Sequence, residues 1–122
     1  MDAEHDPPDR SRYLPEPFEL AVERAGSWTV IRPGGEIDLA TVEQVAQAAG
    51  AAAGDLAVDL RGVTFLDSSG LRFLIEQDRR AREGGRAFAI VPGGPDVQRL
   101  LQIAGLDTRL RVLEEADVAA QD

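Results

Sequence analysis

One stretch near the middle of the chain constrains the fold more than any other, because an apolar run passes there through a polar loop into a helical pattern. The run consists of Val58, Leu60, Val63, Phe65 and Leu66. It predicts a buried strand and the turn that leaves it. Asp67-Ser68-Ser69-Gly70 interrupts the run, and Leu71, Leu74 and Ile75 then follow at helical spacing. We therefore expect a helix to begin at or beside Ser68.

The start of this helix is suited to carrying a phosphate. The first N–H groups of a helix lack intrahelical partners and carry partial positive charge, so a hydroxyl at Ser68 would lie in a favourable place for an anion. A simpler interpretation is an N-cap, for which Ser and Asp are preferred and which contributes about 1 kcal/mol. Gly70 favours the functional interpretation, because glycine in the first turn costs about 0.5 to 1 kcal/mol and bares backbone that another group can approach.

The N-terminal part of the domain predicts two strands. Residues 18–23 and 28–32 alternate apolar and polar side chains around Ala25-Gly26-Ser27, which is typical of an antiparallel hairpin. Pro33-Gly34-Gly35 is expected to end the second strand.

A first helix follows, with its apolar positions at Val42, Val45, Ala46 and Ala49. Asp38 or Thr41 is expected to cap this helix, and Thr41 with Gln44 forms a plausible capping box.

The later elements complete an α/β pattern. They are a central strand over residues 56–60, a second helix ending at Gly84-Gly85, a strand over 87–91, a third helix from Pro95 to Gly105, a strand over 110–113 and a terminal helix over 114–120. Strands separated by helices predict neighbouring parallel strands. We expect a small mixed β-sheet with helices packed mainly on one face.

Length and composition indicate one small cytoplasmic domain. The 122 residues suffice for one core but not for two. The absence of cysteine excludes disulfides and zinc sites built on Cys ligands. We find no signal-peptide pattern and no apolar run near the roughly 20 residues that a membrane span needs.

The net charge of the chain argues against two classes of binding partner. The net charge is −9, and all 13 basic residues are Arg. Such a chain repels nucleic acids and anionic membranes, so we expect neither as a partner. Residues 1–17 contain four prolines and five acidic side chains, which predicts a flexible acidic, Pro-rich tail and leaves residues 18–122 as the domain.

No arrangement of residues predicts catalysis, a metal or a cofactor. A serine-hydrolase elbow would need Gly where Leu66 stands and a histidine base, yet His5 in the tail is the only histidine. Asp38, Asp59 and Asp67 are expected at strand ends, but their spacing matches no ligand set, and a structural role fits Asp59 better. No glycine-rich phosphate loop with a lysine occurs. We expect a substrate of phosphorylation, not an enzyme.

Two motifs together resemble the STAS domain of stand-alone anti-sigma factor antagonists. They are Asp67-Ser68-Ser69-Gly70-Leu71 behind a hydrophobic strand, and Gly35-Glu36-Ile37-Asp38 before the preceding helix. The similarity extends over about residues 18–118. It implies the same fold that the pattern of elements predicts.

The resemblance also implies partners. In partner-switching systems the unphosphorylated antagonist binds an anti-sigma factor that is also a serine kinase of the histidine-kinase-like ATPase fold, and a sigma factor is released. By this resemblance the kinase phosphorylates Ser68, which blocks binding, and a PP2C-type phosphatase reverses the modification. The implied protein is bacterial, monomeric when free, and without cofactor or catalytic residues.

The expected partner-binding surface contains Asp38, Asp67, Ser69, Gly70, Arg72 and Phe73. The resemblance implies that Asp38 lies near Ser68, with Ser69 a residue of the first helical turn. Phe73 lies off the predicted buried stripe, so it either packs at the core margin or anchors a partner. Arg72 pairs with an acidic partner or solubilises the helix. Some family members carry a small residue there.

A phosphate on Ser68 would add about −1.5 to −2 charges. The bare N–H groups of the helix start could hold this charge, whereas a partner packed on the surface could not.

The alternative function is a STAS subunit that is never phosphorylated, as an accessory of a lipid-transport ATPase or of a sensory assembly. The intact acceptor motif favours the antagonist.

Overall fold

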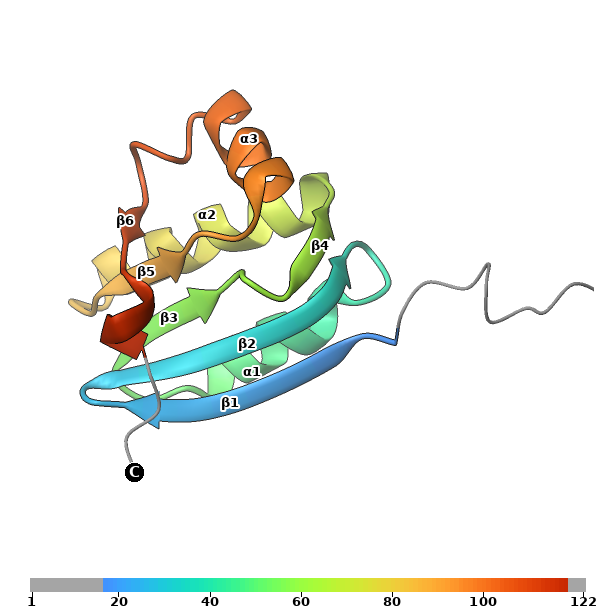
Figure 1. Ribbon diagram of the computed structural model, residues 1–122. Coiled ribbons are helices and arrows are strands. Elements are labelled where there is room, and N and C mark those ends of the chain that lie inside the picture. Colours follow the sequence, from blue (N-terminus) through green and yellow to red (C-terminus); the bar gives the residue numbers. More distant parts are fainter. Residues whose placement is uncertain (1–16, 119–122) are drawn as a thin grey trace, which may run out of the picture.

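The computed structural model describes residues 17–118, which form a single α/β unit (Figure 1). Its elements are β1 (Glu19–Ala25), β2 (Trp28–Ile37), α1 (Val42–Ala51), β3 (Asp55–Asp59), β4 (Val63–Leu66), α2 (Ser68–Glu83), β5 (Phe88–Val91), α3 (Pro95–Ile103), β6 (Arg111–Val112) and the 3₁₀-helix η2 (Glu115–Val118). The predicted tail, residues 1–17, lies outside the described residues except for Pro17.

The six strands form one sheet, which is mixed as the sequence predicts. Strands lie in the order β1-β2-β3-β5-β6, and β4 pairs with β2 beyond the end of β3. Only β1 and β2 pair in antiparallel fashion; every other pair of strands within residues 17–118 is parallel. The hairpin and the helices between parallel strands are therefore confirmed.

The two faces of the sheet bury different apolar residues, because neighbouring residues of a strand point to opposite faces. Leu56 and Val58 of β3 pack with the buried side chains of α1, α2 and α3. Ala57, between them, belongs to a smaller cluster that Val118 of η2 joins. The three α-helices thus cover one face, as predicted, and η2 lies on the other.

The second strand runs five residues beyond its predicted end. We expected Pro33-Gly34-Gly35 to break it, but β2 continues to Ile37 through a register shift between Gly35 and Glu36. Proline is tolerated here because β2 pairs with β3 only up to Ile31 and with β4 only from Gly35 onward. Gly35 adopts φ +107°, a conformation that favours glycine.

The apolar run that predicts one central strand is two strands. A turn at Leu60–Gly62 separates β3 from β4, and the Val63 N–H donates to the Leu60 carbonyl at 3.0 Å. A Cβ on Gly62 would lie 3.1 Å from the Pro33 carbonyl oxygen, so the turn packs closely against β2. Both halves are apolar, and the sequence alone therefore suggests one continuous strand.

Several helix boundaries agree with the sequence. Helix α2 ends before Gly84, and Gly85 has φ +69°, while α3 begins at Pro95. The terminal helix expected over 114–120 is the shorter η2, and residues 119 and 120 lie outside the described residues.

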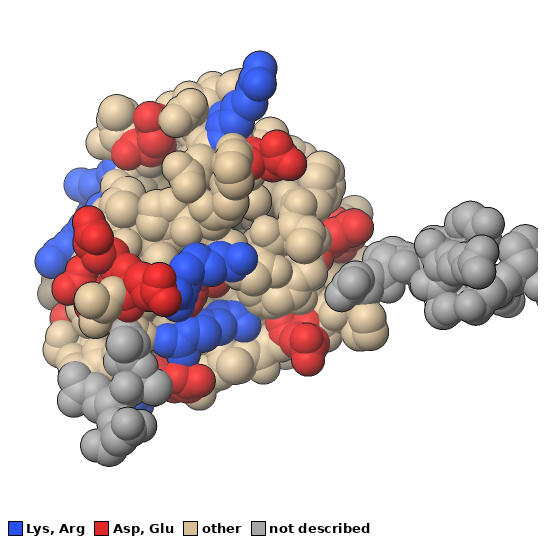
Figure 2. Space-filling model, viewed as in Figure 1, with Lys and Arg blue, Asp and Glu red and all other residues tan. Residues whose placement is uncertain are grey.

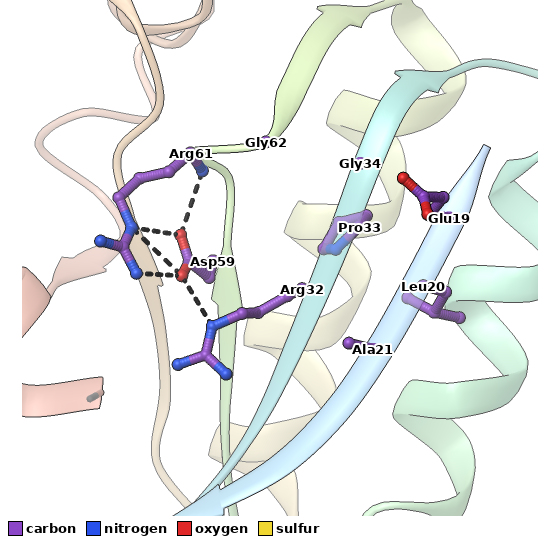
Figure 3. Close-up of a pocket in the computed structure, with 9 residues that line it drawn as sticks. All are labelled: Glu19, Leu20, Ala21, Arg32, Pro33, Gly34, Asp59, Arg61 and Gly62. Atoms are coloured by element: carbon purple, nitrogen blue, oxygen red, sulfur yellow. Dashed lines mark hydrogen bonds and ion pairs between the residues drawn. The ribbon is translucent and has the colours of Figure 1, made fainter. Parts of the chain in front are cut away.

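A buried carboxylate joins β2, the β3–β4 turn and the C-terminal segment. Asp59 is 2% exposed and accepts hydrogen bonds from Arg32 and Arg61, beside a surface hollow lined by β1 and β2 (Figure 3). Arg32 also contacts Glu23, and Arg61 pairs with Glu115 of η2 at 2.6 Å. Asp59 is thus a structural residue. On this side of the molecule, acidic and basic side chains lie next to one another (Figure 2).

The Asp59 carboxylate should contribute measurably to stability. Burial raises its pKa, but the hydrogen bonds and charge of Arg61 and the hydrogen bond from Arg32 outweigh burial and lower it. Replacing Asp59 by Asn should lower the free energy of unfolding by about 2 kcal/mol at pH 7, measured by urea denaturation. Glu115, the exposed ion-pair partner of Arg61, offers a control. Glu115→Gln should lower the free energy of unfolding by less than about 0.5 kcal/mol.

The pH dependence of this effect follows from the lowered pKa. The contribution of a carboxylate with a depressed folded-state pKa is present above the pKa of the unfolded chain, about 4, and disappears as pH falls through the folded-state value. The stability difference between the parent protein and Asp59→Asn should therefore shrink in acid. A difference that stays constant down to about pH 2 would contradict the ionic role.

Candidate functional site

The candidate site lies where two adjacent parallel strands end. Ile37 of β2 pairs with Leu66 of β4, so Asp38 and Asp67 follow directly at the same edge of the sheet. The Asp67 N–H donates to the Ile37 carbonyl at 3.2 Å, and α2 begins at the next residue, Ser68. The structure thus brings together two acidic residues that lie 29 positions apart in the sequence.

Asp67 caps α2. Its Oδ1 accepts hydrogen bonds from the N–H groups of Ser69 and Gly70 at 2.8 and 3.2 Å, and from the Ser69 hydroxyl. The Ser69 hydroxyl is the main cause of a lowered Asp67 pKa; partial burial opposes it, and backbone N–H groups including that of Leu39 add to the lowering. Asp67 is therefore ionised at neutral pH. We expected bare N–H groups at this helix start, but the carboxylate already occupies two of them.

The two serines of the motif differ in their surroundings. Ser68 is the first residue of α2 and is exposed, and its hydroxyl makes no hydrogen bond within residues 17–118. Ser69 is half-buried, and its hydroxyl donates to Asp67. Ser69 lies in the first helical turn, as expected. A reagent that approaches from solvent therefore meets the Ser68 hydroxyl unengaged and the Ser69 hydroxyl bound.

Asp38 shapes the loop before α1. Its Oδ1 accepts from the N–H groups of Ala40 and Thr41 at 2.9 and 3.2 Å. The Thr41 hydroxyl donates to the Glu36 carbonyl at 2.7 Å and accepts from the Asp38 N–H, so it makes no hydrogen bond to the first turn of α1. The predicted capping box is therefore wrong. No hydrogen bond joins Asp38 to Ser68 in the described part of the chain.

Gly70 is needed for packing within the protein. A Cβ at this position would lie 2.7 Å from Leu66 Cδ2, 3.2 Å from Ile37 Cγ2 and 3.3 Å from the Ile37 carbonyl oxygen. The close approach that we predicted at Gly70 is made by the chain's own pair of strand ends. Gly70 is buried and lets α2 begin directly against β2 and β4.

The buried face of α2 is rotated from the predicted one. The buried residues are Gly70, Phe73, Leu74, Gln77, Asp78 and Ala81. Phe73 is only 6% exposed and belongs to the main core, so the idea of an exposed aromatic anchor is wrong. Leu71 and Ile75 are half-buried at the margin. The pattern misled because the buried face of α2 includes a glycine and a glutamine, which a stripe of apolar side chains does not mark.

A groove of about 300 Å³ lies between α1 and α2, beside the start of α2. Its lining residues are Leu39, Val42, Ala46, Ser69, Arg72, Phe73, Glu76, Gln77 and Arg80. Leu39, which the sequence analysis missed, is 80% exposed at its end. The signal was present, because a leucine between Asp38 and Ala40 stands in a loop where polar residues are usual.

Within residues 17–118 the acidic side chains form no cluster suited to a metal ion. No helix in the same range is long and apolar enough to cross a bilayer.

Comparison with known proteins agrees with the fold and the motif. The family profile described as "Mlab, STAS domain" matches residues 20–114. The chain belongs to the STAS domain family. It is 30% identical over 102 residues to the anti-sigma-F factor antagonist RsfB of Mycobacterium tuberculosis, an alignment that covers 80% of this chain and 83% of RsfB.

Solved STAS structures resemble the protein closely. The crystal structure of an anti-sigma factor antagonist from Mycobacterium paratuberculosis superposes with a TM-score of 0.71 at 30% identity, over 81% of this chain and 87% of the other. The unphosphorylated form of the anti-sigma factor antagonist SpoIIAA gives a TM-score of 0.65 at 23% identity, over 80% and 87%, and shows the shared fold. The predicted family membership is confirmed.

The role of Gly70 can be tested against a second helical glycine. Gly70→Ala should lower the free energy of unfolding by about 1 to 2 kcal/mol, because overpacking outweighs the better helix propensity of alanine. Gly50, in α1, has open space where a Cβ would lie, so Gly50→Ala should stabilise the protein by about 0.5 to 1 kcal/mol. Equal effects of the two substitutions in urea denaturation would refute the packing argument.

Proposed function

We propose that this STAS protein is an anti-sigma factor antagonist in a partner-switching pathway. Its unphosphorylated form binds an anti-sigma factor that is also an ATP-dependent serine kinase, and this binding frees a sigma factor. Phosphorylation of Ser68 blocks the binding, and a PP2C-type phosphatase restores it. The protein acts by binding and not by catalysis. The observation that carries the proposal is the exposed Ser68 hydroxyl at the start of α2, which no group within residues 17–118 engages, beside a Ser69 hydroxyl that is already bound.

The names of its relatives support the same role. RsfB is called an anti-sigma-F factor antagonist, and the structure from Mycobacterium paratuberculosis is called an anti-sigma factor antagonist. Both align with about four fifths of this chain, and the family profile spans the whole strand-loop-helix region that carries Ser68.

The surface around Ser68 is suited to a protein partner. Leu39 lies in the loop that follows β2 and is 80% exposed, and Phe65 of β4 is 46% exposed and lies three residues before α2. The groove between α1 and α2 adds the apolar side chains of Val42 and Ala46. Exposed apolar anchors beside an apolar groove are typical of the centre of a binding interface. The partner therefore docks on Leu39, Phe65 and the first turns of α2.

A phosphate on Ser68 would disrupt this interface through its charge. Asp67 is ionised and already occupies the N–H groups of Ser69 and Gly70, so the added dianion gains little from the helix start. The phosphate therefore adds negative charge to the surface that the partner covers. Desolvating such a charge without matched cations on the partner costs several kcal/mol, which lowers affinity by roughly two orders of magnitude or more.

Substitutions at the two serines test the switch. An anti-sigma factor is first isolated from the native host by its binding to the parent protein. Ser68→Ala should bind this factor like the parent protein and resist phosphorylation, whereas Ser68→Asp should bind at least about 10-fold more weakly, measured by calorimetry. Ser69→Ala is the matched control and should still accept one phosphate, localised to Ser68 by mass spectrometry. If Ser68→Ala and Ser68→Asp bind equally well, the protein is instead a constitutive STAS subunit.

Leu39 should be an anchor of the interface. Leu39→Ser should weaken binding of the anti-sigma factor by about 10-fold without loss of stability, because the side chain is exposed in the free protein. Val22 of β1 is also exposed, at 53%, and offers a control outside the proposed surface. Val22→Ser should leave the affinity unchanged; a comparable loss in both variants would count against this placement of the interface.

A further inference from the structure

Helix α2 carries four arginines, and three of them are paired with carboxylates of the same helix. Arg79 pairs with Glu76 and Glu83, Arg80 with Glu76, and Arg82 with Asp78, at distances of 2.5 to 3.0 Å. Arg72 is exposed and forms no ion pair within residues 17–118. It is therefore the arginine of α2 whose charge has no counterion in the described part of the chain.

The carboxylate that could have paired with Arg72 is already engaged. Glu76 lies four residues after Arg72, at a spacing suited to a helical ion pair. Its carboxylate instead accepts hydrogen bonds from Arg79, the main cause of a pKa lowered to about 2, and from Arg80. The Arg72 guanidinium is thus left facing the groove between α1 and α2.

On its other side, Arg72 lies one helical turn after Ser68. Side chains four residues apart in a helix are neighbours, and the order with the acidic group first is the favourable one. A guanidinium matches a phosphate with two parallel hydrogen bonds. The other charged side chains close in the fold are acidic and cannot pair with a phosphate. Asp67 directly precedes Ser68, and Asp38 follows the adjacent strand β2.

We propose that Arg72 binds the phosphate of phosphorylated Ser68 in an intrahelical pair. This inference rests on the proposed phosphorylation of Ser68. Asp67 occupies the N–H groups of Ser69 and Gly70, so the phosphate cannot use these two donors, and the Arg72 guanidinium offers it a charged donor one turn further along α2. Because Arg72 also lines the groove, the pair would alter the docking surface as well as add charge to it. Phosphorylation then removes a free cation from the interface and adds an anion.

The second pKa of the phosphate reports this pair directly. Phosphoserine is placed at position 68 by genetic encoding, which requires no kinase, and the phosphate is titrated by ³¹P NMR in the full chain. The second pKa should be lower in the protein with Arg72 than in Arg72→Ala by about 0.3 to 0.5 units, because a nearby cation favours the dianion. Arg72→Lys should keep part of this lowering.

Arg80 supplies the matched control, since it is on the same helix and lines the same groove but lies 12 residues from Ser68. Arg80→Ala should leave the phosphate pKa within about 0.1 units of the parent value. An unchanged pKa in Arg72→Ala, or an equal rise in both alanine variants, would overturn the pair. Failure of any kinase to modify Ser68 would overturn the proposed function while leaving this titration interpretable.

Discussion

The parallel pairing of β4 with β2 is the constraint on which the site depends. In this register Ile37 lies opposite Leu66, so the two strands end at the same edge of the sheet and Asp38 and Asp67 follow there. Gly70 then packs against both strand ends, with no room for a side chain. A shift of this register by one residue would reverse the faces of β4 and move the start of α2. The position of Ser68 is thus a consequence of sheet pairing.

The acidic side chains of the site bind backbone N–H groups of their own loops and helix start. Asp38 binds the N–H groups of the loop before α1, and Asp67 binds those at the start of α2. The Ser69 hydroxyl also donates to Asp67, so Ser68 is the serine of the motif whose hydroxyl makes no hydrogen bond in the part of the chain that the structure describes. Such an arrangement can accept a phosphate on Ser68 without rearranging. The phosphate would therefore change the affinity for a partner that binds this surface and not the packing of the core.

Local signals in the sequence predicted much of the fold. The start of α2 beside Ser68, its end at Gly84-Gly85 and the beginning of α3 at Pro95 all depend on residues within one or two turns. The interruption between β3 and β4, the passage of β2 through Pro33 and the burial of Phe73 could not be predicted in this way. Each depends on which strand or helix lies alongside, and the residues themselves fit either outcome.

The sequence by itself determined that a strand leads through Asp67 and Ser68 into a helix, because capping and periodicity act between near neighbours. Its motifs also sufficed to identify the family. Only the tertiary structure decided that Gly70 faces β2, and that Phe73 is core while Leu39 is exposed. These outcomes depend on contacts between segments some thirty residues apart, and no local pattern specifies the distance at which such segments meet.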